Sequence, residues 1–273
     1  MKCDIPQLLC YHLAANVTAF STTRHGGCGK GGYASFNINR YCGDDETDIN
    51  RNRDALCLRL GISGSRLIMP HQTHGDRVAC IDNEFLTWND CRRQAELEGI
   101  DAVITSVPEV CIGVSTADCI PILLYDSVHH AAGAVHAGWR GTVQRIVGKA
   151  IEAMTQRYGS QPSILMAQIG PGISIDSFEV GKEVYDTFAC AGFRMDNISR
   201  RYATEASPQG WKWHIDLPGC NRRQLIDAGL RPEAIHMSDI CTYKHPETFF
   251  SARRLGIKSG RIFTGIKLET NKG

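Results

Sequence analysis

The sequence has no excess of either charge: 30 basic and 29 acidic residues give a formal net charge of +1. This balance lacks the basic footprint of proteins that bind nucleic acid or anionic membranes. No run approaches the roughly 18 apolar residues of a spanning helix, and the first residues lack the layout of a signal peptide. We therefore expect a cytoplasmic protein that binds a small molecule, not nucleic acid or a membrane. Nothing in the sequence predicts its oligomeric state.

The chain also lacks any Cys-x-x-Cys pair, although it contains twelve cysteines. Such a count suits a disulfide framework only in a short exported protein. In a 273-residue chain without an export signal, we expect no disulfides and mostly buried thiols.

The glycine-rich segment 26–32 lacks the Gly-Lys-Ser/Thr ending of a phosphate-binding loop. Its composition predicts a flexible or turn-forming loop and suits a flap over a neighbouring site. No repeat, low-complexity run or linker marks a boundary along the chain. We therefore predict one compact domain over residues 1–273.

Apolar periodicity predicts an irregular alternation of strands and helices. The helix after Gly141 is expected to have Thr142 as its N-cap and to end near Gly159, and Asp216 is expected to cap a later helix. This order predicts an α+β fold with mixed β-sheets and packed helices. The expected strands are 110–114, 120–125, 131–137 and 164–169, and the other expected helices are 47–60, 179–191 and 217–229.

Two sequence blocks at the ends of predicted strands contain the side chains that are candidates for catalysis or ligand binding. Thr-Ala-Asp-Cys-Ile-Pro over 116–121 supplies a carboxylate and a thiol, and His-Ala-Gly-Trp-Arg-Gly over 136–141 supplies an imidazole and a guanidinium. Rigid strands aim side chains, and the loops at their ends leave room for a ligand. We expect the functional site where these blocks meet.

Two further imidazoles, His71 and His74, lie in a segment bounded by Pro70 and Gly75. In an extended segment, residues three apart point to opposite faces, so at most one of the two should enter a given site. Cys119, His136 and one of these histidines could form a soft site for zinc or copper.

The same atoms also permit a site without metal. Cys119 could be a nucleophile with His136 as its base, and Asp101 or Asp118 could orient the imidazole. Chelation should inactivate the metal enzyme, whereas an alkylating agent should inactivate the cysteine enzyme even in metal-free buffer.

The chain resembles the YfiH-type laccase-domain family over nearly its whole length. The two strand-end blocks are highly specific to that family, and the other matching motifs occur in the same order. These are Ser-Thr-Thr-Arg over 21–24, Ser-Phe-Asn over 35–37, His-Gln-Thr-His-Gly over 71–75, Asp-Ala over 101–102, Ile-Gly-Pro over 169–171, Phe-Glu-Val-Gly over 178–181, Cys-Thr-Tyr over 241–243 and Phe-Phe-Ser over 249–251.

The resemblance implies a mixed α+β fold and a metal site holding Zn2+, with copper possible. The ligands that it implies are His74, Cys119 and His136, which would also be the catalytic residues. His71 then becomes a residue of the surrounding pocket that contacts substrate.

The resemblance further implies a zinc-dependent purine nucleoside phosphorylase that acts on adenosine, inosine, guanosine and methylthioadenosine and also deaminates adenosine. The partners would be a nucleoside and phosphate. Alternatives within the family are a copper-dependent, laccase-like polyphenol oxidase and a hydrolase using Cys119 and His136 to edit a cell-wall precursor. A four-copper laccase needs about ten histidine ligands, with His-x-His pairs. This chain has ten histidines altogether and no His-x-His, which argues against that name.

Five further side chains are predicted to handle substrate. Arg24 and Arg140 are the guanidiniums nearest the motifs, and a phosphate needs cationic groups around it. Asn37 and Asp101 could address ribose hydroxyls or the base. Asp118, which directly precedes Cys119, is the fifth candidate.

Overall fold

Two β-sheets lie face to face at the centre of the molecule, in a computed structural model that describes residues 4–270. The first sheet has the strand order β1-β2-β14-β6-β3. Its pairs are antiparallel except β3 with β6. Its strands are β1 (Leu8–Tyr11), β2 (Val17–Thr22), β14 (Ile262–Leu268), β6 (Cys111–Thr116) and β3 (Leu67–Ile68).

The second sheet has the order β13-β9-β7-β8-β5-β4 and mixes parallel with antiparallel pairs. Its central strands, β7 and β8, are buried on both faces. The strands are β13 (Ile235–Met237), β9 (Met166–Ile169), β7 (Ile120–Asp126), β8 (Ala131–Ala137), β5 (Ala102–Thr105) and β4 (Val78–Ile81).

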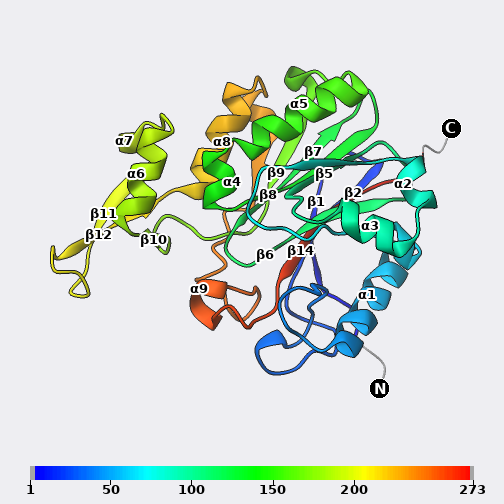
Figure 1. The fold of residues 1–273 in the computed structure, drawn as a ribbon, viewed down its shortest axis with the longest axis horizontal. Helices are drawn as coiled ribbons and strands as arrows, with labels where there is room; N and C mark the ends of the chain where they lie inside the picture. Colours follow the sequence, from blue (N-terminus) through cyan, green and yellow to red (C-terminus); the bar gives the residue numbers. More distant parts are fainter. Residues whose placement is uncertain (1–3, 271–273) are drawn as a thin grey trace.

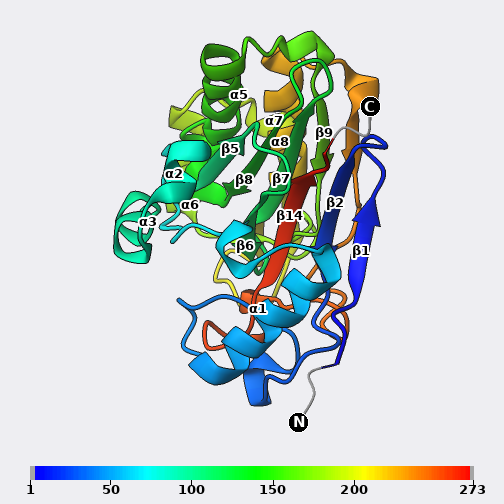
Figure 2. The ribbon, with the colours of Figure 1, turned by 90° about the vertical axis from the view of Figure 1, so that its right-hand side faces the viewer.

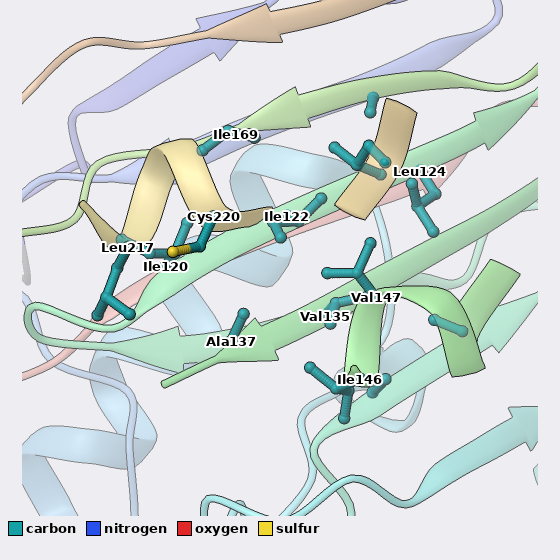
Figure 3. Packing of buried hydrophobic residues seen from close by; sticks show 14 of the residues in the cluster. Ile120, Ile122, Leu124, Val135, Ala137, Ile146, Val147, Ile169, Leu217 and Cys220 are labelled. Carbon is teal, nitrogen blue, oxygen red and sulfur yellow. The ribbon is translucent and has the colours of Figure 1, made fainter. Parts of the chain in front are cut away.

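Alternation along the central strands builds two cores. Leu123 and Tyr125 of β7 enter the core between the sheets, where the small Ala132 and Ala134 of β8 let the layers approach closely. The intervening Ile122 and Leu124 point to the opposite face and pack under helices, as Figure 3 shows. Burial on both faces explains why these strands are mostly apolar, with Asp126 and His136 near their ends.

Helices cover the outer faces of the two sheets. On the second sheet lie α4 (Trp139–Val143), α5 (Ile146–Tyr158) and α8 (Leu217–Asp227), and α1 (Glu46–Leu60) packs with a core on the outer face of the first. No helix of residues 4–270 is long and apolar enough to cross a bilayer. The other helices are α2 (Asn83–Thr87), α3 (Asp90–Glu96), α6 (Lys182–Cys190), α7 (Met195–Ile198) and α9 (Ala252–Leu255), with 3-10 turns at η1 (Gly31–Tyr33), η2 (Gly64–Arg66), η3 (Pro162–Ile164) and η4 (Pro232–Ala234).

A small third sheet extends from the main body together with α6 and α7, on the left of Figure 1. Its order is β10-β12-β11, formed by β10 (Glu179–Val180), β12 (Trp211–Ile215) and β11 (Ser199–Ala203). The α+β class with mixed sheets is confirmed, and no disulfide joins the cysteines of residues 4–270. The expectation that most cysteines are buried was wrong, since only Cys57, Cys111, Cys220 and Cys241 are buried in that part of the chain.

The predicted helix after Gly141 is in fact two helices. Arg145 adopts a left-handed conformation, with φ of 63°, and so separates α4 from α5. Thr142 therefore lies inside α4 rather than at an N-cap, whereas the end at Gly159 and the cap by Asp216 are confirmed. The predicted strand 164–169 begins late because a 3-10 turn precedes it, and the predicted helix 179–191 begins late because residues 179–180 pair as β10.

Candidate metal centre

Three ligand side chains from distant parts of the sequence meet at one end of the two sheets. A nitrogen of His74, the Cys119 sulfur and a nitrogen of His136 all lie within 4.8 Å of one another. His74 lies in the loop between β3 and β4, Cys119 in the turn from β6 to β7, and His136 near the end of β8. The structure thus brings together the three residues predicted as ligands.

The backbone turns sharply at His74, where φ is 64°. The segment is therefore not extended there, so that premise was wrong, although only one of the two histidines joins the ligand cluster, as expected. Both side chains line the same pocket. Only His74 reaches Cys119 and His136, and its ring lies edge-on to that of His136 at 4.9 Å.

Asp101 holds both histidine-bearing segments in place. One carboxylate oxygen lies 2.7 Å from Nδ1 of His136, and the two oxygens accept hydrogen bonds from the backbone N–H groups of Thr73, His74 and Gly75. The carboxylate is fully buried. Because Nδ1 of His136 is occupied, its Nε2 is the nitrogen that faces Cys119 and His74. Asp101 thus positions ligands and does not line the pocket.

Asp118 fixes the turn that presents Cys119. Its backbone has a φ of 87°, and its carboxylate accepts hydrogen bonds from the Thr242 hydroxyl and from the Arg253 backbone N–H, both at 2.7 Å. Since the protein itself uses both oxygens, Asp118 orders the turn and does not line the pocket. A left-handed conformation at a residue other than glycine costs free energy, and these two hydrogen bonds offset that cost.

The cluster has a marked electrostatic character. Burial alone would raise the pKa of the Cys119 thiol, but the neighbouring His136 and His74 outweigh burial and lower this pKa to about 6. Burial alone would lower the pKa of His136, but Cys119 and Asp101 raise it to about 9. Near neutral pH and without metal, the pair therefore exists as a thiolate beside an imidazolium.

The pocket around the cluster has a volume of about 280 Å³. Two flat side chains form part of its wall: the ring of Tyr41 stacks on that of His71 at 3.9 Å, and His71 Nδ1 lies 2.8 Å from both oxygens of Glu98. Arg261 also lines the pocket. Tyr41 and Arg261 were not predicted from the sequence, because neither belongs to a motif with recognisable chemistry.

Three predicted substrate residues lie elsewhere. The Arg24 guanidinium donates to the carbonyls of Ala34 and Pro246 and packs over Phe250. The Asn37 side chain is fully buried and donates to Asp44. Arg140 is exposed and covers its neighbour Trp139. None of the three lines the pocket.

The glycine-rich segment 26–32 does not line the pocket either. Backbone hydrogen bonds fix its position: Gly29 donates to Ser35, and Gly260 donates to Gly32. The second bond joins the segment to the loop that carries Arg261.

The donor set fits a soft metal ion. One thiolate and two imidazoles are typical ligands of zinc or copper, and three protein ligands leave a fourth position for water or substrate. Gly138 keeps the space clear, because a Cβ there would lie 3.0 Å from both the Cys119 sulfur and a carbon of the His74 ring. Among residues 4–270 this is the one group of three or more such side chains close enough to hold an ion.

Known proteins are similar to this chain over almost its whole length. A family model described as "Multi-copper polyphenol oxidoreductase laccase" matches residues 18–269. A purine nucleoside phosphorylase of Bacteroides thetaiotaomicron is 44% identical over 254 residues, which cover 93% of this chain and 92% of that protein. Adenosine deaminase RL5, from an unknown prokaryotic organism, is 44% identical over 92% of this chain and 93% of its own. The structure of YfiH from Bacillus licheniformis matches with a TM-score of 0.88 at 28% identity, covering 97% of each chain.

Proposed function

The chain belongs to the multi-copper polyphenol oxidoreductase laccase family, and from that premise we propose that it is a zinc-dependent purine nucleoside phosphorylase that also deaminates adenosine. The proposed substrates are adenosine, inosine, guanosine and methylthioadenosine. The names of two relatives that are each 44% identical, a purine nucleoside phosphorylase and an adenosine deaminase, support this choice. The observation that carries it is the cluster of His74, Cys119 and His136 within a pocket.

In this proposal His74, Cys119 and His136 hold the metal and Asp101 orients the imidazole of His136. A zinc ion bound there would supply Lewis-acid activation of water for the deamination. The low pKa of Cys119 keeps the thiolate form available at neutral pH, which is the form that binds metal.

Other residues of the pocket wall can contact the purine ring and the phosphate. The stacked pair of Tyr41 and His71 offers flat surfaces to a purine ring. Arg261 lines the pocket, where phosphate must approach the sugar carbon during phosphorolysis, and its guanidinium also donates to the backbone carbonyls of Ile257, Ser259 and Gly260. This group takes over the role that the sequence suggested for Arg24 and Arg140.

The donor set also argues against a multicopper oxidase. A laccase needs a trinuclear centre besides its single copper site, whereas residues 4–270 contain one cluster of three ligands. Any oxidase activity is expected to come from copper bound in place of zinc at that cluster.

A second candidate function rests on the same pair of side chains. The lowered pKa of Cys119, the raised pKa of His136 and the carboxylate of Asp101 on Nδ1 reproduce the arrangement of a cysteine hydrolase. Such an enzyme would hydrolyse an amide bond, as in the editing of a cell-wall precursor. It would remain active after chelation and lose activity on alkylation.

The test is product analysis with purified protein of measured metal content. Inosine and adenosine are incubated with and without phosphate, and mass spectrometry detects free base, ribose 1-phosphate and inosine formed from adenosine. We expect Cys119→Ala and His136→Ala to lose at least about a hundredfold of the activity, since each removes a ligand. The control is His129→Ala, because His129 forms a similar pair with Asp126 but does not line the pocket.

Full activity of Cys119→Ala would overturn the metal-site assignment. Absence of product from every nucleoside, with metal bound, would overturn the proposed reaction. A cytoplasmic location belongs to the same proposal, since a thiolate ligand and the lack of disulfides among the cysteines of residues 4–270 suit a reducing compartment.

A further inference from the structure

A second hollow, of about 540 Å³, adjoins the metal pocket. Three arginines line it: Arg40, Arg53 and Arg93. We call it the arginine hollow. Tyr41 lines both the hollow and the metal pocket, so this one side chain forms part of the wall between them.

The three guanidiniums of the hollow have no carboxylate partner within 4.0 Å among residues 4–270. Their hydrogen bonds go instead to neutral oxygens: Arg40 donates to Asn50, Arg53 to the Leu67 carbonyl, and Arg93 to two backbone carbonyls. Nε of Arg93 is buried without an acceptor. Each guanidinium has five N–H donors, so most of this donor capacity is unused.

Two of these cations also disfavour each other. Burial lowers the pKa of Arg53, and the positive charge of Arg40 lowers it further. The exposed carboxylates of Asp54 and Asp90 also line the hollow and form no ion pair with the three arginines, although the charge of Asp54 partly offsets the lowering of the Arg53 pKa. An anion in the hollow would relieve the repulsion and take up the free donors.

The position of the hollow indicates which anion this is. A phosphate that attacks the sugar carbon must lie about 3–3.5 Å from it. The reacting bond belongs on the side of Tyr41 where Cys119 and His136 lie, because these residues line the metal pocket and not the hollow. The hollow therefore suits a negative group several bonds away from the reaction.

We propose that the arginine hollow binds a phosphoryl group carried by the substrate, so that purine nucleoside 5′-monophosphates are preferred over the corresponding nucleosides. This inference rests on the proposed function and specifies its substrate class. A phosphate monoester carries a charge of nearly −2 at neutral pH, and a guanidinium fork can bind two of its oxygens at once. Binding energy from such a remote group can also help to position the reacting bond.

The experiment compares AMP with adenosine in the zinc-loaded protein, by kcat/KM for release of base or ammonia and by calorimetric titration. We expect AMP to exceed adenosine by about tenfold or more, as one charge-assisted contact would give. Arg40→Met should reduce this AMP-to-adenosine ratio at least severalfold. Arg53→Lys should also reduce it, because lysine keeps the charge but loses the fork.

The matched control is Arg92→Met. It removes the same charge beside Arg93, but Arg92 pairs with Glu84 and does not line the hollow. We expect the ratio to stay unchanged in this variant. A third arm measures KM for inorganic phosphate with inosine as substrate.

The outcomes separate the two proposals. An AMP-to-adenosine ratio near one, unaltered by Arg40→Met, overturns the phosphoryl site and leaves the nucleoside activity standing. If Arg40→Met raises the KM of inorganic phosphate but leaves the AMP-to-adenosine ratio unchanged, the hollow binds the co-substrate phosphate, and our inference is also overturned. Tight AMP binding that depends on Arg40, without turnover of any purine compound, supports the site and rejects the proposed reaction.

Discussion

At the scale of single residues, the thiol of Cys119 differs most from its isolated counterpart. A buried cysteine ordinarily becomes harder to ionise, as the raised pKa of Cys57 shows. Beside His136 and His74 the sign reverses, because two imidazoles stabilise the thiolate more than burial disfavours it. The same thiolate is what a soft metal ion requires.

This reversal predicts how the metal-free protein reacts with iodoacetamide. Because the pKa of Cys119 is lowered to about 6, its thiolate is present above that pH and disappears as the pH falls through it. We expect the alkylation rate of Cys119 to reach half its maximum near pH 6, measured by peptide mapping after short pulses between pH 4.5 and 9. The Cys57 peptide should label slowly throughout, since burial raises its pKa.

Two results decide this prediction. A midpoint above pH 8 for Cys119 would contradict the ionised pair. Zinc added before the reagent should protect Cys119, because the metal occupies the sulfur.

At the scale of elements, the turns orient the ligand side chains, and the strands determine where the turns lie. The left-handed residues His74 and Asp118 each redirect the chain directly at the site. Each is supported from outside its own segment, His74 through Asp101 and Asp118 through Thr242. Their conformations therefore depend on the packing of other elements.

Strand β6, which leads into the Cys119 turn, contains a glycine that the packing requires. A Cβ at Gly113 would lie 2.2 Å from the ring of Phe263 on the neighbouring β14 and 2.6 Å from the Thr264 carbonyl oxygen. We expect Gly113→Ala to lower the free energy of unfolding by about 1–3 kcal/mol, because the ring or the backbone must move. Urea denaturation measures this change.

The matched control for this prediction is Gly148→Ala in α5. No atom lies within 4 Å of a Cβ built at Gly148, and alanine favours the helix by about 0.5–1 kcal/mol. We expect this variant to be more stable than the wild type. Equal stability of both alanine variants would contradict the crowding at Gly113.

At the scale of the whole molecule, the candidate metal centre lies where the two central sheets are joined. Cys119 lies in the turn that passes from β6 in one sheet to β7 in the other, and His136 lies on β8 of the second sheet. His74 comes from the loop between β3 and β4, which also joins the two sheets. A bound ion would therefore tie both halves of the sandwich together.

This placement predicts that metal removal destabilises the fold as well as the activity. With free zinc at one hundred times its Kd, binding adds about 2.7 kcal/mol. Chelation should then lower Tm by roughly 5–10 °C, and zinc should restore it. Scanning calorimetry of wild type and Cys119→Ser measures the effect, and the variant should show no such shift. An unchanged Tm of wild type, with metal loss verified, would contradict a site that ties the sheets together.

Local structure and the kind of chemistry could be predicted from the order of the amino acids. The apolar runs of β7 and β8 and the caps at Asp216 and Gly159 depend on neighbouring residues, so they could be predicted closely. The types of metal ligand could also be predicted, because thiolate and imidazole groups favour soft metal ions wherever they lie in the sequence. The break between α4 and α5 at Arg145 could not be predicted, since no neighbouring residue indicates that an arginine will adopt a left-handed conformation.

How the side chains combine depends on contacts between distant parts of the chain. Asp101 became a support for His136 and the His74 loop, and Arg24 and Asn37 became supports of loops away from the pocket. Arg261 came to line the pocket from a position 125 residues beyond His136 in the sequence. These contacts arise because two sheets stack on each other, and stacking brings together residues whose spacing in the chain carries no periodic signal.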